Sequence, residues 1–117
     1  MSLLVNTYTG MPGDMEIVEV EHSDELAGFE ACRTELWGAP VARSLGCAIL
    51  PALAERDIYI GPDQLDGLSR DVDTLLSNME RVVSETPYDE DFIRHRCSNI
   101  QKAIDRARST GGSVVIW

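Results

Sequence analysis

The sequence predicts an α+β fold, because strand-like stretches at both ends enclose two long stretches with helical periodicity. Apolar residues recur at the helical period over 63–85 and again over 88–109, and Thr86-Pro87 separates the two. Gly111-Gly112 then precedes the apolar stretch 113–117, which is typical of a strand. We therefore expect a small antiparallel or mixed sheet, made of an N-terminal hairpin and the C-terminal strand. A long antiparallel helical hairpin and one or two shorter helices would pack against this sheet.

The N-terminal hairpin is predicted from two strand-like runs. Leu3–Val5 is a short apolar run that we expect to be an edge strand, and the turn-rich residues 9–14 follow it. Residues 15–21 then alternate between apolar and acidic side chains. The alternation slips once at Ile17-Val18, which indicates a β-bulge or burial on both faces of the strand.

The middle of the chain predicts shorter elements. Apolar residues at helical spacing predict a helix over about 24–37, and Ser23 or Asp24 could cap it. These apolar residues are Leu26, Phe29, Cys32 and Leu36. Residues 36–54 are the most apolar stretch, but prolines, glycines and Arg43 interrupt it, so it is too broken to span a bilayer. We expect a buried turn and a short helix there. Residues 57–60 then predict a short strand or an extended connector.

The helical hairpin has start and stop signals as well as periodicity. Pro62 suits the first position of the first helix, and Thr86-Pro87 forms a cap and first turn for the second. Three acids, Asp89 to Asp91, lie where the positive end of that second helix favours them. The C-terminal strand is expected to complete the sheet and to bury Trp117. Alternatively, it is an edge strand that a partner extends, with Trp117 as an anchor.

Length and composition indicate a single globular domain over 1–117, because 117 residues with 44% apolar and 26% charged residues can bury one core. The three cysteines are Cys32, Cys47 and Cys97, and their wide spacing predicts reduced, buried thiols. No signal peptide is visible at the N-terminus, so we expect a cytoplasmic location.

The formal net charge of −10 is unevenly distributed. Residues 14–35 and residues 63–91 hold most of the acids, whereas residues 92–117 are net basic. This balance disfavours nucleic acid and anionic membranes as partners, because both require a basic surface. It favours a basic protein, although an acidic surface also serves plain solubility. The acids that we expect to contact such a partner are Glu16, Glu19, Glu21, Asp24 and Glu25.

The motifs of common enzyme and metal-binding classes are absent. The sequence contains no phosphate-binding loop, no dinucleotide fingerprint, no zinc-protease motif and no nucleophile elbow. His95 and Cys97 are two residues apart, so on a helix they point to different sides and do not form a metal site. We therefore expect no catalytic residues, no metal and no cofactor.

Two arginines stand in apolar surroundings. Arg96 falls within an apolar helical face made of Ile93, Cys97, Ile100, Ile104 and Ala107, and Arg43 is isolated in the stretch 36–54. A guanidinium in such a place needs an acceptor. One hypothesis is a pocket for an anionic ligand, lined by Arg96, Arg43, Tyr88 and Trp37. The alternative is an internal salt bridge to Glu35, Glu55 or Asp57.

Three functions follow from these observations. The leading hypothesis is a small acidic protein-binding module, of an inhibitor, immunity-like or regulatory kind, that acts on a basic partner. The second is a small-molecule binding or enzymatic domain centred on Arg96 and Arg43. The third is a structural subunit of a homo-oligomer. It is disfavoured by the polar outer positions of the first long helix, which are Arg70, Asp73, Ser77, Glu80 and Arg81.

Overall fold

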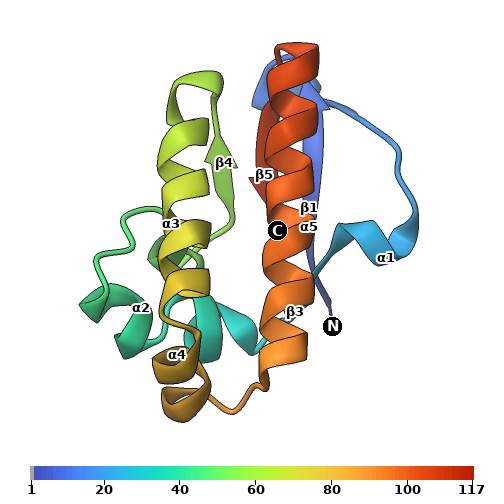
Figure 1. Ribbon diagram of the computed structural model, residues 1–117. Coiled ribbons are helices and arrows are strands. Elements are labelled where there is room, and N and C mark those ends of the chain that lie inside the picture. Colours follow the sequence, from blue (N-terminus) through green and yellow to red (C-terminus); the bar gives the residue numbers. More distant parts are fainter. Residues whose placement is uncertain (1) are drawn as a thin grey trace.

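The computed structural model describes residues 2–117, and its fold is α+β, as predicted. A five-stranded antiparallel sheet has β1 (Ser2–Thr9) at its centre. On one side of β1 lie β5 (Ser113–Ile116) and then β4 (Ile58–Ile60). On the other side, β3 (Leu26–Phe29) and β2 (Glu16–Ile17) pair with opposite ends of β1. The two long helices lie side by side on the same face of this sheet (Figure 1).

The predicted helical hairpin is confirmed, with one break. Its first arm consists of α3 (Leu65–Ser77) and α4 (Met79–Glu85), and its second arm is α5 (Glu90–Thr110). Asn78 separates α3 from α4, because its Nδ2 donates to the carbonyl of Thr74 at 2.8 Å and competes with the helical backbone bonds. The single helix expected over 63–85 is therefore wrong at this position.

The C-terminal end of α5 follows the sequence signals, but the predicted start is wrong. Thr86 and Pro87 precede the helix, and Thr86 Oγ1 instead donates to the carbonyl of Val82 at the end of α4. Asp89 caps the N-terminus, where its Oδ1 accepts the N–H of Phe92 at 2.8 Å. Gly111 ends the helix with a φ of 69°, a conformation that favours glycine, and the N–H of Gly112 donates to Ala107. The predicted apolar face of α5 is fully buried, from Ile93 to Ala107.

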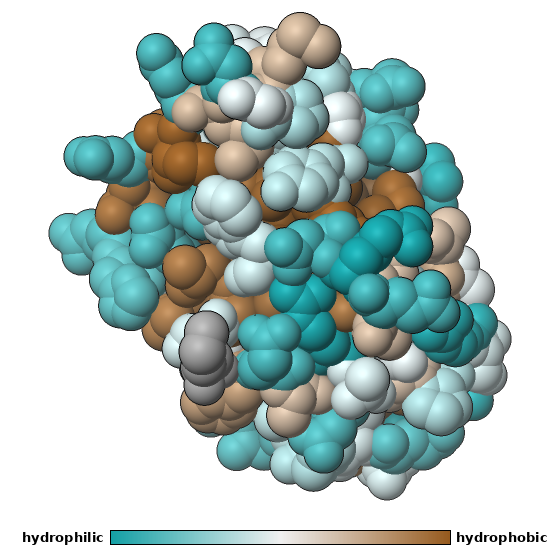
Figure 2. Space-filling model, turned by 180° about the vertical axis from the view of Figure 1, so that it is seen from behind, coloured by the Kyte–Doolittle hydropathy of each residue, from teal (hydrophilic) through white to brown (hydrophobic). Residues whose placement is uncertain are grey.

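β1 is the central strand, not the edge strand that we expected, because its backbone bonds to strands on both sides. Thr7 lies on the face toward the helices, where its Oγ1 donates to the carbonyl of Ala103 at 2.7 Å. By the alternation of a strand, Asn6 and Tyr8 lie on the opposite face. We call this the far face, and Figure 2 views the molecule from that side, with apolar brown atoms scattered among hydrophilic teal ones.

The helix expected over 24–37 is wrong. The chain instead forms α1 (His22–Glu25), which is a single turn, then β3, and then a short π-helix over Arg33–Trp37. Gly28 has a φ of 111°, which an α-helix cannot contain, and a Cβ there would lie 2.6 Å from Cys32 Sγ. The helical spacing of Leu26 and Phe29 is therefore coincidental, since their backbone pairs with β1, whereas Leu36 lies in the short π-helix.

The apolar stretch 36–54 forms short helical elements, broadly as predicted. They are α2 (Pro40–Ser44) and a 3-10 helix over Leu50–Ala54. The connector between them is fixed to α3 by Asp71, whose buried carboxylate accepts three backbone N–H groups at 2.8 to 3.0 Å. These donors belong to Ala48, Ile49 and Leu50.

The remaining strand predictions are partly correct. β4 is confirmed, but the strand expected over 15–21 is reduced to β2, and beyond it the N–H of Val18 still donates to Thr7. The slip of the apolar pattern at Ile17-Val18 accounts for this early end. β5 completes the sheet between two other strands, so the alternative of an open C-terminal edge strand is wrong. Trp117 is half-buried, and its Nε1 donates to Asn6 Oδ1 at 3.0 Å.

Within residues 2–117, none of the helices combines the length and the apolar composition that crossing a bilayer requires.

Candidate functional site

The first candidate surface is the acidic arm, which we define as residues 14–25. Near its start, this stretch contains β2, which pairs with the end of β1, and in Figure 1 the chain then loops outward and returns at α1. Glu16, Glu19 and Glu21 are exposed, and their side chains form no ion pair or hydrogen bond with any residue in the range 2–117. The arm therefore presents three carboxylates that the protein itself does not neutralise.

The other two predicted contact residues of the arm have internal partners. Asp24 accepts the Nζ of Lys102 at 3.4 Å, and Glu25 accepts the Nδ2 of Asn6 at 3.2 Å. Asn99, which is buried on α5, also holds the arm's end by donating to the carbonyls of Ser23 and Leu26. These contacts anchor the C-terminal end of the arm, while its three glutamates remain directed to solvent.

The second candidate surface is built around Arg96, which is half-buried on α5. Its guanidinium carbon lies 4.1 Å from the centre of the Phe92 ring, a cation–π contact. Phe92 in turn stacks on Tyr88, at a centroid distance of 4.7 Å, and on Phe29, at 5.7 Å. Phe29 is 54% exposed, so one end of the cluster is open to solvent. We call these four residues the Arg96 stack.

The Arg96 guanidinium is largely without hydrogen-bond partners. Its Nη1 lies 2.7 Å from His95 Nδ1, whereas its Nε is buried and has no partner in the described chain. Neither Arg96 nor Arg43 takes part in an ion pair among residues 2–117, so the internal salt bridge to Glu35, Glu55 or Asp57 is absent there. Stacking on Phe92 takes its place.

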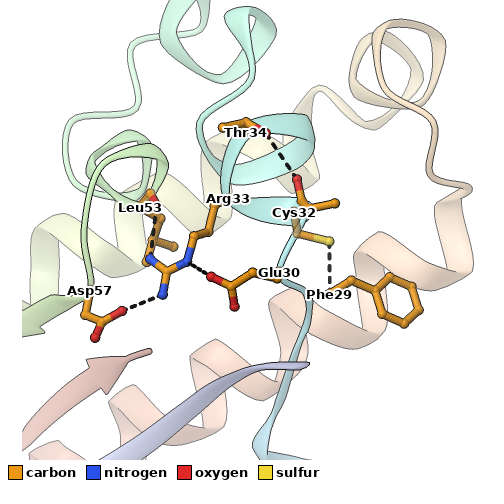
Figure 3. Close-up of polar contacts among 8 residues, drawn as sticks. Phe29, Glu30, Cys32, Arg33, Thr34, Leu53 and Asp57 are labelled. Carbon is orange, nitrogen blue, oxygen red and sulfur yellow. Dashed lines mark hydrogen bonds and ion pairs between the residues drawn. The ribbon is translucent and has the colours of Figure 1, made fainter. Parts of the chain in front are cut away.

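The ion pair that we expected for Arg96 or Arg43 belongs to Arg33 instead. Its guanidinium contacts the carboxylates of Glu30 and Asp57 and donates to the Leu53 carbonyl at 3.1 Å (Figure 3). Burial by itself lowers the pKa of Arg33, but its hydrogen bonds to Asp57 and Glu30 outweigh burial, and the pKa is raised. Arg33 thus joins the segment before the π-helix to the start of β4.

Of the four residues predicted for an anionic-ligand pocket, the structure joins Arg96 and Tyr88 through Phe92. Tyr88 donates its hydroxyl to Glu35 Oε1 at 3.0 Å, and burial together with the nearby Cys32 and Glu35 raises its pKa. Trp37 is buried in the core, where its Nε1 donates to the Ala27 carbonyl at 2.9 Å.

Arg43 is exposed on α2 and donates weakly to the carbonyl of Pro51 at 3.4 Å.

The sequence analysis did not identify Phe29 and Phe92 as members of the Arg96 stack. The signal for Phe92 was present, because Phe92 and Arg96 are four residues apart and so share one side of α5. Phe29 could not be found this way, since it comes from β3.

The cysteines have the character of core thiols. Cys32, Cys47 and Cys97 are free and buried. Burial raises the pKa of Cys47 to about 11 and that of Cys97 to about 12, and it also raises the pKa of Cys32. These thiols are protonated at neutral pH and are poor nucleophiles there. Among residues 2–117, no group of three histidine, cysteine or acidic side chains is arranged to hold a metal ion.

No protein-family model, curated protein or solved structure significantly matches this chain.

Proposed function

We propose that this protein is a protein-binding module of an inhibitory, immunity-like or regulatory kind, and that its acidic arm binds a basic partner protein. The observation that supports this proposal most is the state of Glu16, Glu19 and Glu21, which are exposed and unpaired within the described chain. The chain as a whole has twenty acids and only ten lysines and arginines, so internal pairing cannot neutralise it.

The physical basis of such binding is electrostatic steering. An acidic surface attracts a basic protein over roughly one Debye length, about 8 Å at physiological salt, and so increases the association rate. Carboxylates that are already solvated and free can pair with lysines and arginines without first breaking internal contacts. We retain the prediction of a cytoplasmic location, which the three free thiols support.

The experiment compares two variants of equal net charge. The arm variant carries Glu16→Gln, Glu19→Gln and Glu21→Gln. The control variant neutralises three other acids that are exposed and form no ion pair among residues 2–117: Glu55→Gln, Asp73→Asn and Glu80→Gln. The wild type and both variants are immobilised and exposed to lysate of the source cells at low salt.

We expect a stoichiometric basic protein on the wild type and on the control variant. The arm variant should lose this protein, and about 0.5 M salt should release it from the wild type. Loss from both variants to the same degree would mean that overall charge, and not the arm, attracts the protein. Retention by the arm variant would overturn the proposal.

A second candidate function is binding of an anionic ligand at the Arg96 stack, because the Arg96 Nε is buried without a partner and no carboxylate of residues 2–117 pairs with this arginine. Its test is thermal unfolding with a panel of carboxylates and phosphates. The wild type and Arg70→Ala, whose arginine is exposed on α3, should be stabilised by one ligand class, whereas Arg96→Ala should not. Equal stabilisation of all three proteins would exclude this candidate.

The homo-oligomer hypothesis has less support. The outer positions of α3 and α4 are exposed and polar, and they include Arg70, Asp73 and Glu80. This composition is typical of a solvated helix surface and not of an interface core.

A further inference from the structure

The outer edge of β4 offers backbone hydrogen-bonding groups that β5 does not use. Leu4 and Trp117 exchange two backbone hydrogen bonds of 2.9 Å at the end of the β1–β5 pair. Because bonded and non-bonded pairs alternate along antiparallel strands, the Asn6–Val115 pair is also bonded. The residues of β5 that alternate with Val115 and Trp117 are Val114 and Ile116, and they therefore direct their N–H and C=O groups toward β4.

The same alternation fixes the orientation of β4. Ile58 lies opposite Ile116 and Ile60 lies opposite Val114, so both isoleucines direct their backbone groups to β5. Tyr59, which lies between them, must direct its N–H and C=O away from β5. Because β4 is the last strand on this side of the sheet, these two groups point to an open edge.

A hollow of about 500 Å³ runs along this edge. One wall is the continuous stretch from Arg56 to Ile60, and the other includes Ala48, Ile49 and Ala52. The second wall is on the helix side of the sheet, because Asp71 of α3 accepts the N–H groups of Ala48 and Ile49. Figure 1 shows β4 next to α3 at this end of the sheet.

The two faces of an added strand would meet different surroundings. Tyr59 lies on the far face, where its ring meets that of Tyr8 edge to face at 6.3 Å, and it is 44% exposed. A residue paired with Tyr59 would place its side chain on that face too. Its two neighbours would direct their side chains to the helix side, toward Ile49 and Ala52, so apolar residues suit these positions.

The hollow also has a charge preference. Arg56 is exposed and forms no ion pair or hydrogen bond through its side chain within residues 2–117. Asp57, the acid in the same lining, is already paired with Arg33. The lining therefore has an uncommitted positive charge, which a carboxylate complements.

We propose that the β4 edge binds an extended segment of a partner protein by adding it to the sheet as an antiparallel strand. The segment exchanges two hydrogen bonds with the backbone of Tyr59. It places apolar side chains beside Ile49 and Ala52, and an acidic side chain against Arg56. This surface is separate from the acidic arm, so the proposal does not depend on the proposed function.

The probe is the blocked peptide acetyl-Val-Thr-Val-Thr-Glu-amide, in which the first threonine pairs with Tyr59 and the glutamate reaches Arg56. It is titrated into the isotopically labelled full chain and followed by amide NMR shifts. We expect saturable shifts confined to residues 48–60. The Tyr59 amide should exchange quickly with solvent in the free protein and become protected at saturation, whereas Ile58 and Ile60 should be protected throughout.

The controls test each contact separately. Methylating the nitrogen of the first threonine removes the hydrogen bond to Tyr59 and should abolish binding. Arg56→Glu should weaken binding about fivefold, and a peptide with lysine in place of glutamate should restore it. Arg70→Glu makes the same charge change on an exposed arginine outside the hollow and should leave the affinity unchanged.

Three results would overturn the proposal. The first is the absence of shifts in residues 48–60 at millimolar peptide. The second is equal binding of the methylated peptide. The third is the same set of shifts on concentrating the protein alone, because the occupant would then be a second copy of the chain.

Discussion

At the scale of single residues, one buried carboxylate joins α3 to the segment that follows α2. Asp71 is 3% exposed, and its two carboxylate oxygens accept three N–H groups, two from the connector after α2 and one from Leu50 at the start of the following 3-10 helix. Each hydrogen bond to a charged group contributes about 1.5–3 kcal/mol, and a buried donor left without an acceptor is costly. Asp71 therefore stabilises this segment by supplying the acceptor for three backbone N–H groups.

Asp71→Ala should lower the free energy of unfolding by about 3–5 kcal/mol, because three N–H groups lose their acceptor together. Denaturant unfolding measures this change. The matched control is Asp73→Ala on the same helix, which is exposed and should change stability by no more than about 0.5 kcal/mol. Equal effects of the two substitutions would contradict the role of Asp71.

The buried thiols predict how stability depends on pH. The folded-state pKa of Cys47 is raised from 9.0 to about 11, so the folded protein disfavours the thiolate. Stability from this group is fully present below pH 9 and decreases as pH rises toward 11. The difference in unfolding free energy between the wild type and Cys47→Ala should shrink between neutral pH and about pH 10. A constant difference would show that Cys47 does not contribute.

At the scale of elements, the helical hairpin and the C-terminal strand were predictable, because the apolar periodicity and the glycines after the second helix indicated the same structure. α5 is the clearest case, since its predicted apolar face is buried and Gly111 ends it, although Asp89 caps its start in place of the predicted Thr86. The segment 24–37 could not be predicted, since helical spacing of four apolar residues also occurs by chance and long-range pairing with β1 decides the outcome. The Arg96 stack was only partly predictable. Arg96 and Tyr88 could be identified from the sequence, but Phe29 could not, because it comes from β3, which the sequence did not indicate.

Gly28→Ala tests whether β3 depends on a glycine at this position. An alanine there must adopt a φ of 111°, and its Cβ would also lie 2.6 Å from Cys32 Sγ. We expect a loss of about 1–3 kcal/mol from the backbone, and a further loss from the clash. Gly46→Ala is the control, because it has a φ of 93° but nothing within 4 Å of the new Cβ. The account is contradicted if Gly46→Ala destabilises the protein as much as Gly28→Ala.

At the scale of the whole molecule, the excess of acids lowers the stability of the folded protein, and binding of a basic partner would relieve this repulsion. Like charges repel one another and destabilise the compact state, and the repulsion is strongest at low salt. The side chains of Glu16, Glu19 and Glu21 form no ion pair or hydrogen bond among residues 2–117, so no internal pairing of these carboxylates offsets the repulsion.

The arm variant, with Glu16→Gln, Glu19→Gln and Glu21→Gln, should therefore be as stable as the wild type or slightly more stable at low salt. The expected change in unfolding free energy is within about 0.5 kcal/mol. Thermal and denaturant unfolding at low and high salt measure it. A loss well above 1 kcal/mol would show that these glutamates support the fold, which would remove the argument that they are free for a partner.

The most direct test of the acidic arm as a binding surface is carbodiimide crosslinking in lysate of the source cells, because this reagent joins carboxylates to lysines only where they are in contact. Asp24 and Lys102, whose side chains lie 3.4 Å apart, supply an internal reference crosslink. We predict crosslinks from Glu16, Glu19 or Glu21 to lysines of one other protein, and we predict that high salt removes them. Recovery of the Asp24–Lys102 crosslink, with no intermolecular crosslink from the three glutamates, would contradict the proposal.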